Sequence, residues 1–506
     1  MRRFPYLALL ILIRLILHAL LYLQGFESLT ADEFGRTVLA ARWAQHPYNL
    51  LSGPWLPFPI YIHGLALMFV WELLWVPRVL TIITGILLIV VLYYLNIALF
   101  EDPKIGRIGA FLLTFNPVHI WLSSTPLTEG SYTLLVFCFL YSSILYLKTE
   151  NKKYLYLSVV WLTIANGFRL EAWIMSTIFT LLMGIRITKN FRGKKPFDIF
   201  KDFSVISIPW IFPLIWIAAN YINTHDPLAT FNLIRSYKRA WYFGEGGLKQ
   251  YLNAFLTNDP FITILFPIGA ILGFNWCKNR KVFSWYLIFA FFPLITFMLM
   301  HGGQVEPWGN IIRYLAPFAF ILYPLLSILL YKVAVIISNR LTRHFLSPIT
   351  TAIVLLALIA IVQLNTTFHF VKDPVSDGLK VGLKIRHLRK QSGELDNRPV
   401  MIELSYWQYL AVQIGANDIN GILYDRVLDY EHRQTQSLIS SDPEAFWGCI
   451  AQYQIGYLVI KSPELIETVE RKFHLSPSET INEYAFYKIP EDFDKVISIT
   501  KPCPLY

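Results

Sequence analysis

The sequence predicts a polytopic α-helical membrane protein with a C-terminal α/β domain outside the cytoplasm. Three observations indicate this fold class. First, 55% of the 506 residues are hydrophobic and only 15% are charged, which is unusual for a water-soluble globular protein. Second, apolar stretches long enough to cross a bilayer recur up to residue 364. Third, the composition becomes mixed and polar from residue 365 onwards.

The candidate membrane spans follow from length, because a helix needs about 20 mostly apolar residues to cross the hydrocarbon core. Apolar segments begin near residues 5, 58, 78, 106, 131, 155, 172, 203, 260, 283, 315 and 348. The run from Pro5 to Leu23 is too long for a signal peptide and lacks a small-residue cleavage site. We therefore expect it to remain as the first span.

Basic residues indicate which segments cross, because short cytoplasmic loops are rich in Lys and Arg. The basic clusters are Arg2/Arg3, Lys104/Arg107, Lys148/Lys152/Lys153, Arg186/Lys189/Arg192/Lys194/Lys195/Lys201, Lys278/Arg280/Lys281 and Lys332/Arg340/Arg343. If every apolar segment crossed, all but the first of these clusters would fall on the wrong side. The segment 57–75 is the best candidate for one that stays in the outer interface, because it begins with prolines and has an apolar core of only about seven residues.

About eleven spans then remain. This topology predicts a multi-pass protein of the plasma membrane with a cytoplasmic N-terminus, every basic cluster inside and the C-terminal domain outside. The net charge of +10 is explained by these loops, so no nucleic-acid partner is expected.

The segment after Leu364 has strand-like runs at 400–404, 456–460 and 484–489, with helix-like stretches between them. About 140 residues can bury a core. We therefore expect a transmembrane domain at residues 1–364 and an extracytoplasmic α/β domain at residues 365–506.

The four cysteines show no metal-binding spacing, so no metal site is expected. Cys449 and Cys503 are the one pair that we consider for a disulfide, because both lie in the segment placed outside the cytoplasm. Whether they are bridged stays open from the sequence. The chain also lacks a P-loop, an HExxH motif and a Gly-rich dinucleotide turn, and hence the parts for NTP-driven transport or zinc proteolysis.

Acidic residues occur in two predicted outer loops. Asp32 and Glu33 follow the first span, and Glu129 lies in the sequence STPLTEG at 124–130. Acids favour the first turn of a helix, so Asp32 and Glu33 could simply start one. Sugar transfer to a hydroxyl, however, needs a carboxylate that takes the acceptor's proton, and burial raises the pKa of such a group. Both interpretations stay open, and Asp32 is the first candidate for a general base.

Basic side chains accompany these acids. Arg14 and His18 lie one turn apart on the first span and are costly in lipid, so we expect them to face a cavity or charged partners. Arg14 either neutralises the acids or contacts a donor phosphate. Arg169, His301 and Arg313 lie on the predicted outer face and are, with Arg14, the candidate ligands of a donor phosphate. Arginine binds phosphate with bidentate geometry, which makes Arg313 the best candidate for a phosphate ligand.

For Arg169, the alternative to binding a phosphate is an ion pair with Glu171, or a side chain that extends to the membrane interface.

Taken together, these features resemble the multi-span GT-C glycosyltransferases, especially the branch of the protein O-mannosyltransferases and lipid A aminoarabinose transferases. The resemblance covers residue 1 to about residue 330. The matching features are the first span with Arg14, Asp32-Glu33, Pro57 and Pro59, Arg78, Asn116-Pro117, Glu129 and Arg313-Tyr314-Leu315-Ala316-Pro317.

The resemblance implies a function. Asp32 corresponds to the acid that activates the acceptor, whereas the family usually has Asp where this chain has Glu129. The implied donor is a polyprenyl-phosphate-linked sugar, and the implied acceptor is a hydroxyl of a lipid, glycan or protein of the cell envelope. Transfer on the extracytoplasmic face by an inverting displacement is expected. No cofactor is implied, and a divalent cation is left open.

Two other functions are weighed against transfer. A lipid or solute transporter or flippase of the cell-envelope polysaccharide pathway would use the same charged cavity without covalent chemistry. Transporters usually have inverted repeats and broken helices, and the sequence indicates neither. A non-catalytic assembly or export protein would use the outer domain as a partner surface and would tolerate the loss of Asp32.

Overall fold

The computed structural model describes residues 4–30, 32–48, 55–189, 195–241, 247–301, 308–340, 348–369, 377–391, 398–403, 406–424, 426–428, 435–437, 443–481, 483–490 and 503. The chain divides into two compact units. The first unit comprises Met1–Phe26, Tyr48–Ile62 and Arg78–Asp373. The second comprises Glu27–Pro47, His63–Pro77 and Pro374–Tyr506.

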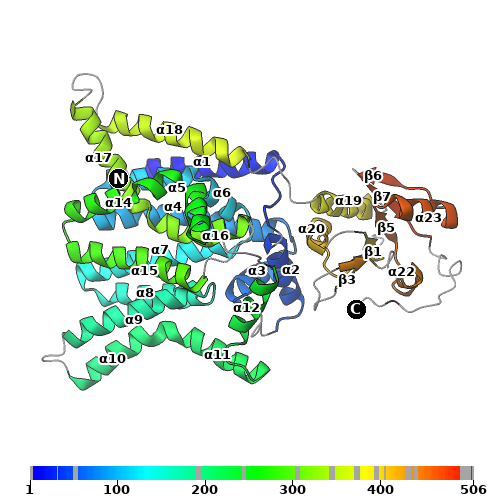
Figure 1. The fold of residues 1–506 in the computed structure, drawn as a ribbon, viewed down its shortest axis with the longest axis horizontal. Coiled ribbons are helices and arrows are strands. Elements are labelled where there is room, and N and C mark those ends of the chain that lie inside the picture. Colours follow the sequence, from blue (N-terminus) through cyan, green and yellow to red (C-terminus); the bar gives the residue numbers. More distant parts are fainter. Residues whose placement is uncertain are drawn as a thin grey trace. The chain divides into compact units, whose positions relative to one another are not determined.

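The first unit is a bundle of helices (Figure 1). Its helices are α1 (Phe4–Leu23), α4 (Trp75–Phe100), α5 (Pro103–Phe115), α6 (Pro117–Ser124), α7 (Thr128–Thr149), α8 (Lys152–Asn166), α9 (Glu171–Lys189), α10 (Pro196–Ser207), η1 (Ile208–Trp210), α11 (Ile211–Thr224), α12 (Ala229–Trp241), α13 (Gly247–Asn258), α14 (Pro260–Trp276), α15 (Arg280–His301), α16 (Trp308–Ile321), α17 (Tyr323–Arg340) and α18 (Pro348–His369).

Within the described ranges, seven helical segments are long and apolar enough to cross a membrane, or nine if each of two bent helix pairs is one span. The remaining spans expected near residues 106 and 155 fall on shorter helices. Helix α5 has 13 residues and is followed directly by α6 with 8, because Asn116 caps α6 and Pro117 begins it; helix α8 has 15. Helix α3 (Phe58–Phe69) has 12 residues, which is too short to cross.

The two bent pairs correct the expectation of unbroken helices. Helices α13 and α14 meet at 97°, and α16 and α17 meet at 55°. At the sharper bend, Asp259 caps α14 by accepting hydrogen bonds from the backbone N–H of Phe261 and Ile262 at 2.9 and 3.1 Å. Its other oxygen accepts from Tyr323 at 2.8 Å and Gln363 at 3.2 Å. The bend is therefore held to α17 and α18 by a buried carboxylate.

The second unit contains α2 (Asp32–Gln45), part of α3 and the C-terminal α/β fold. The remaining elements are α19 (Gly378–Gln391), β1 (Val400–Ile402), α20 (Tyr406–Ala416), β2 (Ile422–Tyr424), β3 (Arg426–Leu428), β4 (Thr435–Ser437), α22 (Pro443–Gln452), β5 (Tyr457–Ile460), α23 (Pro463–Phe473), β6 (Glu479–Ile481) and β7 (Tyr484–Lys488). The expected α/β character of this segment is confirmed.

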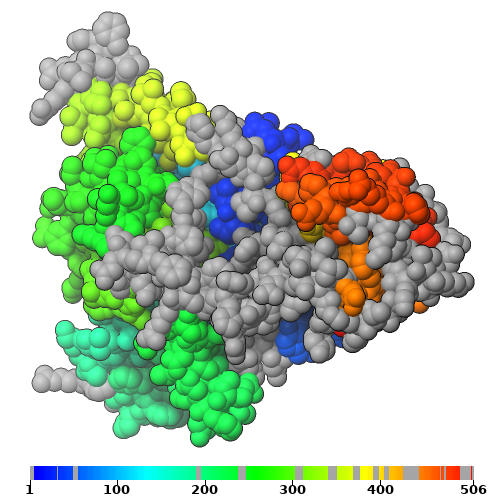
Figure 2. Space-filling model, turned by 45° about the vertical axis from the view of Figure 1, so that its right-hand side comes forward, coloured from blue at the N-terminus to red at the C-terminus, as the bar shows by residue number. Residues whose placement is uncertain are grey.

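The main sheet has the order β2-β1-β5-β7-β6, with β2, β1 and β5 parallel and β7 and β6 antiparallel to their neighbours. Its central strands are apolar on both faces because helices cover them; Met401, Leu458 and Ile460 are fully buried. Much of the orange and red surface in Figure 2 belongs to this sheet and to α22 and α23. A disulfide joins Cys449 of α22 to Cys503, which settles the question that the sequence left open.

Close packing of α14 on α17 gives a testable consequence. A Cβ atom at Gly269 would overlap the carbonyl oxygen of Leu325, whereas a Cβ atom at Gly184 would lie 3.6 Å from the ring of Phe203. We predict that Gly269→Ala lowers the free energy of unfolding by about 1–3 kcal/mol, because backbone cannot move aside as a flexible side chain can. Thermal unfolding in detergent measures this. Gly184→Ala is the control, and an equal effect of both substitutions would contradict the packing.

Candidate functional site

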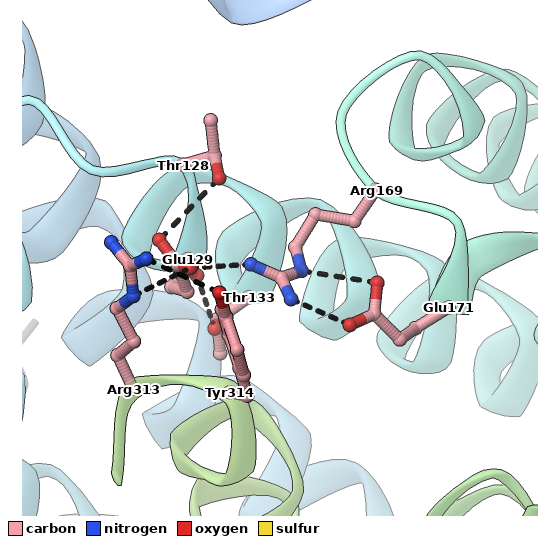
Figure 3. Close-up of polar contacts among 7 residues, drawn as sticks. All are labelled: Thr128, Glu129, Thr133, Arg169, Glu171, Arg313 and Tyr314. Carbon is pink, nitrogen blue, oxygen red and sulfur yellow. Dashed lines mark hydrogen bonds and ion pairs between the residues drawn. The ribbon is translucent and has the colours of Figure 1, made fainter. Parts of the chain in front are cut away.

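The candidate site of the first unit is centred on Glu129. This residue lies in the first turn of α7, where an acid is favoured by the helix dipole, and its side chain is fully buried. Thr128 donates a hydrogen bond to Glu129 Oε2 at 3.4 Å, and the hydroxyl of Thr133 donates to the Glu129 backbone oxygen at 2.6 Å. Figure 3 shows that two arginines approach the carboxylate from different segments.

Arg169 is the first of these arginines and lies in the connection between α8 and α9. Its Nη1 pairs with Glu129 Oε1, while its Nε and Nη2 donate to the two oxygens of Glu171 at 3.1 and 2.5 Å (Figure 3). The ion pair with Glu171 that the sequence suggested is thus present, together with a second one. Burial disfavours the charged form, but Glu171 and Glu129 outweigh it and raise the pKa of Arg169.

Arg313 is the second arginine and comes from α16. Its side chain is 1% exposed, and its Nε lies 3.8 Å from Glu129 Oε1. Tyr314 accepts a hydrogen bond from Arg313 Nη2 at 3.3 Å. The Tyr314 ring also lies between the two cations, with its centroid 5.0 Å from Arg313 Cζ and 5.2 Å from Arg169 Cζ.

The charges of this site explain how its side chains are held together. Two guanidinium groups of like charge are kept together in a buried place by one shared carboxylate. Their planar donors match the oxygens of a phosphate. The site is therefore chemically suited to bind an anion and to stabilise negative charge that develops on it.

Arg14 lies in a separate network between α1, α5 and α6. Its Nη1 donates to the carbonyl oxygen of Thr114 at 2.8 Å, its Nη2 to Ser123 Oγ at 2.6 Å and its Nε to His18 Nε2 at 3.1 Å. Nη2 also lies 3.1 Å from His119 Nδ1. Within the part of the chain that the structure describes, these acceptors of Arg14 are neutral. The structure thus ties Arg14 to the end of α6, a few residues before Glu129.

His301 lies at the end of α15 and is buried. Its Nδ1 is 2.6 Å from the hydroxyl of Tyr251 on α13. The structure therefore joins His301 to the helix that precedes the sharp bend.

Asp32 and Glu33 begin α2 in the second unit, as expected for acids of a first turn. Glu33 is 1% exposed, and its two oxygens lie 3.2 and 3.3 Å from the backbone N–H of Leu29, which donates to them. Asp32 is half-buried. Glu129 belongs to the first unit, so the meeting of Asp32 and Glu129 in one pocket stays a prediction.

His63 of α3 is buried, and this burial, followed by the charge of Arg36 on α2, lowers the pKa of His63 to about 4, which keeps the imidazole neutral near pH 7.

Sequence reasoning missed the buried cluster around Asp259. The signal for it was present, because Asn258-Asp259-Pro260 before an apolar run is typical of a capped helix start. Asn258 donates to the carbonyl oxygen of Ile312 at 3.0 Å, which fixes the backbone next to Arg313. Among the described residues, no group of three or more His, Cys, Asp or Glu side chains could hold a metal ion.

Comparisons with known proteins identify the fold. No protein-family model and no curated protein sequence matches the chain. The structure of ArnT from Cupriavidus metallidurans bound to undecaprenyl phosphate matches with a TM-score of 0.65 and 10% identity, over 96% of this chain and 98% of that one. The apo oligosaccharyltransferase of Archaeoglobus fulgidus matches with a TM-score of 0.54 and 14% identity, over 93% and 70%.

The archaeal oligosaccharyltransferase AglB from Archaeoglobus fulgidus, in complex with an inhibitory peptide and a dolichol-phosphate, matches with a TM-score of 0.51 and 13% identity, over 94% of this chain and 71% of that one. ArnT and AglB are GT-C glycosyltransferases, so the GT-C fold that the sequence predicted is confirmed. Together with its apolar helices, this fold makes the chain an integral membrane protein.

The ion pairs of the site predict a difference between two substitutions. Glu129→Gln leaves Arg313 and Arg169 without their shared carboxylate, so we expect a loss of about 3–5 kcal/mol in the free energy of unfolding. Glu150→Gln breaks an ion pair with Arg186 in which the Glu150 side chain is 78% exposed, so a loss below about 1 kcal/mol is expected. Unfolding of both variants in detergent tests this. A Glu129→Gln protein as stable as Glu150→Gln would disprove the role of Glu129.

Proposed function

We propose that this protein is a membrane glycosyltransferase that moves a sugar from a polyprenyl-phosphate donor to a hydroxyl of a lipid, glycan or protein. The observation that carries the proposal is the pair of arginines that meet at the buried carboxylate of Glu129 within a GT-C fold. The matched ArnT structure is bound to undecaprenyl phosphate, and that of AglB holds a dolichol-phosphate. A phosphate held by arginines fits both the site and these similarities.

The donor phosphate is bound by Arg313 and Arg169, and Glu129 keeps both guanidinium groups in place. When the bond between the anomeric carbon and the phosphate oxygen breaks, the phosphate leaves with the electron pair. The two arginines stabilise the charge that accumulates on it. Because Glu129 is engaged by two cations, its role is to organise them rather than to accept a proton.

Asp32 is the proposed general base, with Glu33 beside it. The acceptor oxygen attacks the anomeric carbon, the transition state has oxocarbenium-ion character, and the hydroxyl proton passes to the Asp32 carboxylate. One displacement inverts the anomeric centre. The proposal is supported by the resemblance of this loop to that of the GT-C family and by the half-buried position of Asp32.

Arg14 and His301 receive supporting roles in this scheme. The neutral acceptors around Arg14 favour a role in fixing α1 to α5 and α6, and hence the start of α7, over direct contact with the donor. His301 and Tyr251 support α13 in the same way. A place for the C-terminal domain outside the cytoplasm is supported by the disulfide between Cys449 and Cys503, because such bonds are rare in a reducing compartment.

A lipid transporter or flippase is the second candidate, and the bent helix pairs favour it, since broken helices are typical of transporters. Purified protein in detergent, incubated with radiolabelled polyprenyl-phosphate sugars and a membrane acceptor extract, separates the two functions. An enzyme moves the label into a new product, whereas a transporter leaves the donor intact.

Substitution of the base is the first test within this assay. We predict that Asp32→Asn lowers transfer by about 10²–10⁴-fold, because the amide cannot accept the hydroxyl proton. Donor binding and expression should be nearly unchanged. Undiminished turnover of Asp32→Asn would remove Asp32 from the role of base.

Substitution of the phosphate ligand should affect a different step. We predict that Arg313→Lys raises the donor KM at least about tenfold, because the ammonium group cannot reproduce the planar donor pair of a guanidinium. Steady-state kinetics with varied donor measure this. Arg186→Lys, at a half-exposed arginine, is the matched control. Equal donor KM values in the two variants would argue against phosphate binding by Arg313.

A further inference from the structure

The second unit brings together segments that are far apart in the sequence. Helix α2 and the segment 63–77 fold with the C-terminal α/β domain as one compact unit. Helix α2 carries Asp32, and it packs against α20 of the C-terminal domain. The contacts within this unit therefore decide how α2 is held.

Asn417 makes three of the contacts within this unit. It follows α20 with a φ of 58°, a left-handed conformation that Asn tolerates better than most residues. Its side-chain oxygen accepts from the backbone N–H of Leu73 at 2.8 Å, and its Nδ2 donates to the carbonyl oxygen of Trp71 at 3.1 Å. The indole N–H of Trp71 donates back to the Asn417 carbonyl oxygen at 3.3 Å. One side chain thus docks the segment that follows α3.

An ion pair lies beside these hydrogen bonds. Arg386 of α19 donates from Nη1 and Nη2 to the two oxygens of Glu72 at 3.1 and 2.7 Å. Both side chains are partly shielded, with exposures of 28% and 21%. A bidentate pair of this kind fixes orientation as well as distance.

Two further contacts involve α2. Asn420 Nδ2 donates to Gln45 Oε1 at the end of α2 at 3.0 Å. A Cβ atom at Gly64 of α3 would overlap the ring of Trp43, so α3 and α2 approach closely. The segment 63–77, which includes Gly64, is therefore in direct contact with α2.

Helices α19 and α20, which carry or precede these contact residues, are closely packed. Helices α19 and α20 pack backbone to backbone, because a Cβ atom at Gly382 would overlap the carbonyl oxygen of Val412 and one at Gly415 would press against that of Leu379. Arg386 on α19 and Asn417, directly after α20, thus belong to one closely packed helix pair. This packing favours a fixed position of α2 over a flexible attachment.

We infer that the outer α/β domain positions α2, and that Asn417 and the ion pair of Arg386 with Glu72 are positioning residues for Asp32. The catalytic part of this inference rests on the proposed function. In this inference the outer domain positions a part of the enzyme itself. The alternative from the sequence was that this domain is a binding surface for an external partner. Substitutions that weaken the contacts of α2 should then lower kcat/KM for the acceptor without changing the KM for the donor.

A charge exchange tests the ion pair. Hydrogen exchange of residues 32–45 is measured in full-length wild type, Glu72→Arg, Arg386→Glu and the double variant, together with kinetic constants for donor and acceptor. Each single variant should exchange faster in α2 and lose several-fold in kcat/KM for the acceptor, with the donor KM unchanged. The double variant should recover both properties, because the opposite charges face each other again.

Two further variants sharpen the test. Asn417→Gly keeps the left-handed backbone but removes the amide, so it should loosen α2 as the single charge variants do. Arg471→Glu, in an exposed pair with Glu467 on α23, should leave α2 unchanged.

Unchanged exchange in α2, equal effects in Arg471→Glu, or faster exchange without loss of acceptor use would each overturn the inference. Wild-type protein without transfer activity would instead overturn the proposed function. The hydrogen exchange of residues 32–45 would still decide whether the outer domain positions α2.

Discussion

The first unit depends on one electrostatic constraint, which is the balance of charge at a buried carboxylate. Glu129 is fully buried, and so is Arg313, while Arg169 is held from the other side by Glu171. Without the carboxylate, two cations would face each other in a place that water does not screen. With it, they form a preorganised pair of guanidinium groups, which we propose as the ligands of a phosphate. The same constraint explains why α7, α16 and the connection before α9 converge at this point.

Around this centre, buried polar and charged side chains position the segments. Arg14 reaches α5 and α6 through a carbonyl oxygen, a hydroxyl and the imidazole of His119, while Asn258 holds the carbonyl oxygen next to Arg313. Asp259 holds the sharp bend to α17 and α18. These groups carry no reacting atoms in our account. They set the places from which the charged side chains act, as α19 and α20 do for α2 in the second unit.

The sequence was sufficient for the fold class because apolar length and the change in composition after Leu364 are strong signals. The ion pair of Arg169 with Glu171 was foreseeable because the residues are two apart. The neutral partners of Arg14 were not, because Ser123 and the carbonyl oxygen of Thr114 carry no charge that marks them as ligands. The bend at Asp259 was missed because the apolar run beyond it looks like one ordinary span, although its cap was visible in the sequence.

We propose above all that Arg313 and Arg169 bind the phosphate of a lipid carrier beside Glu129. The most direct measurement is an experimental structure of the protein with bound polyprenyl phosphate. We expect phosphate oxygens within hydrogen-bond distance, about 2.7–3.2 Å, of the guanidinium nitrogens of both arginines. A phosphate bound elsewhere, with the two arginines still closed on Glu129, would contradict it.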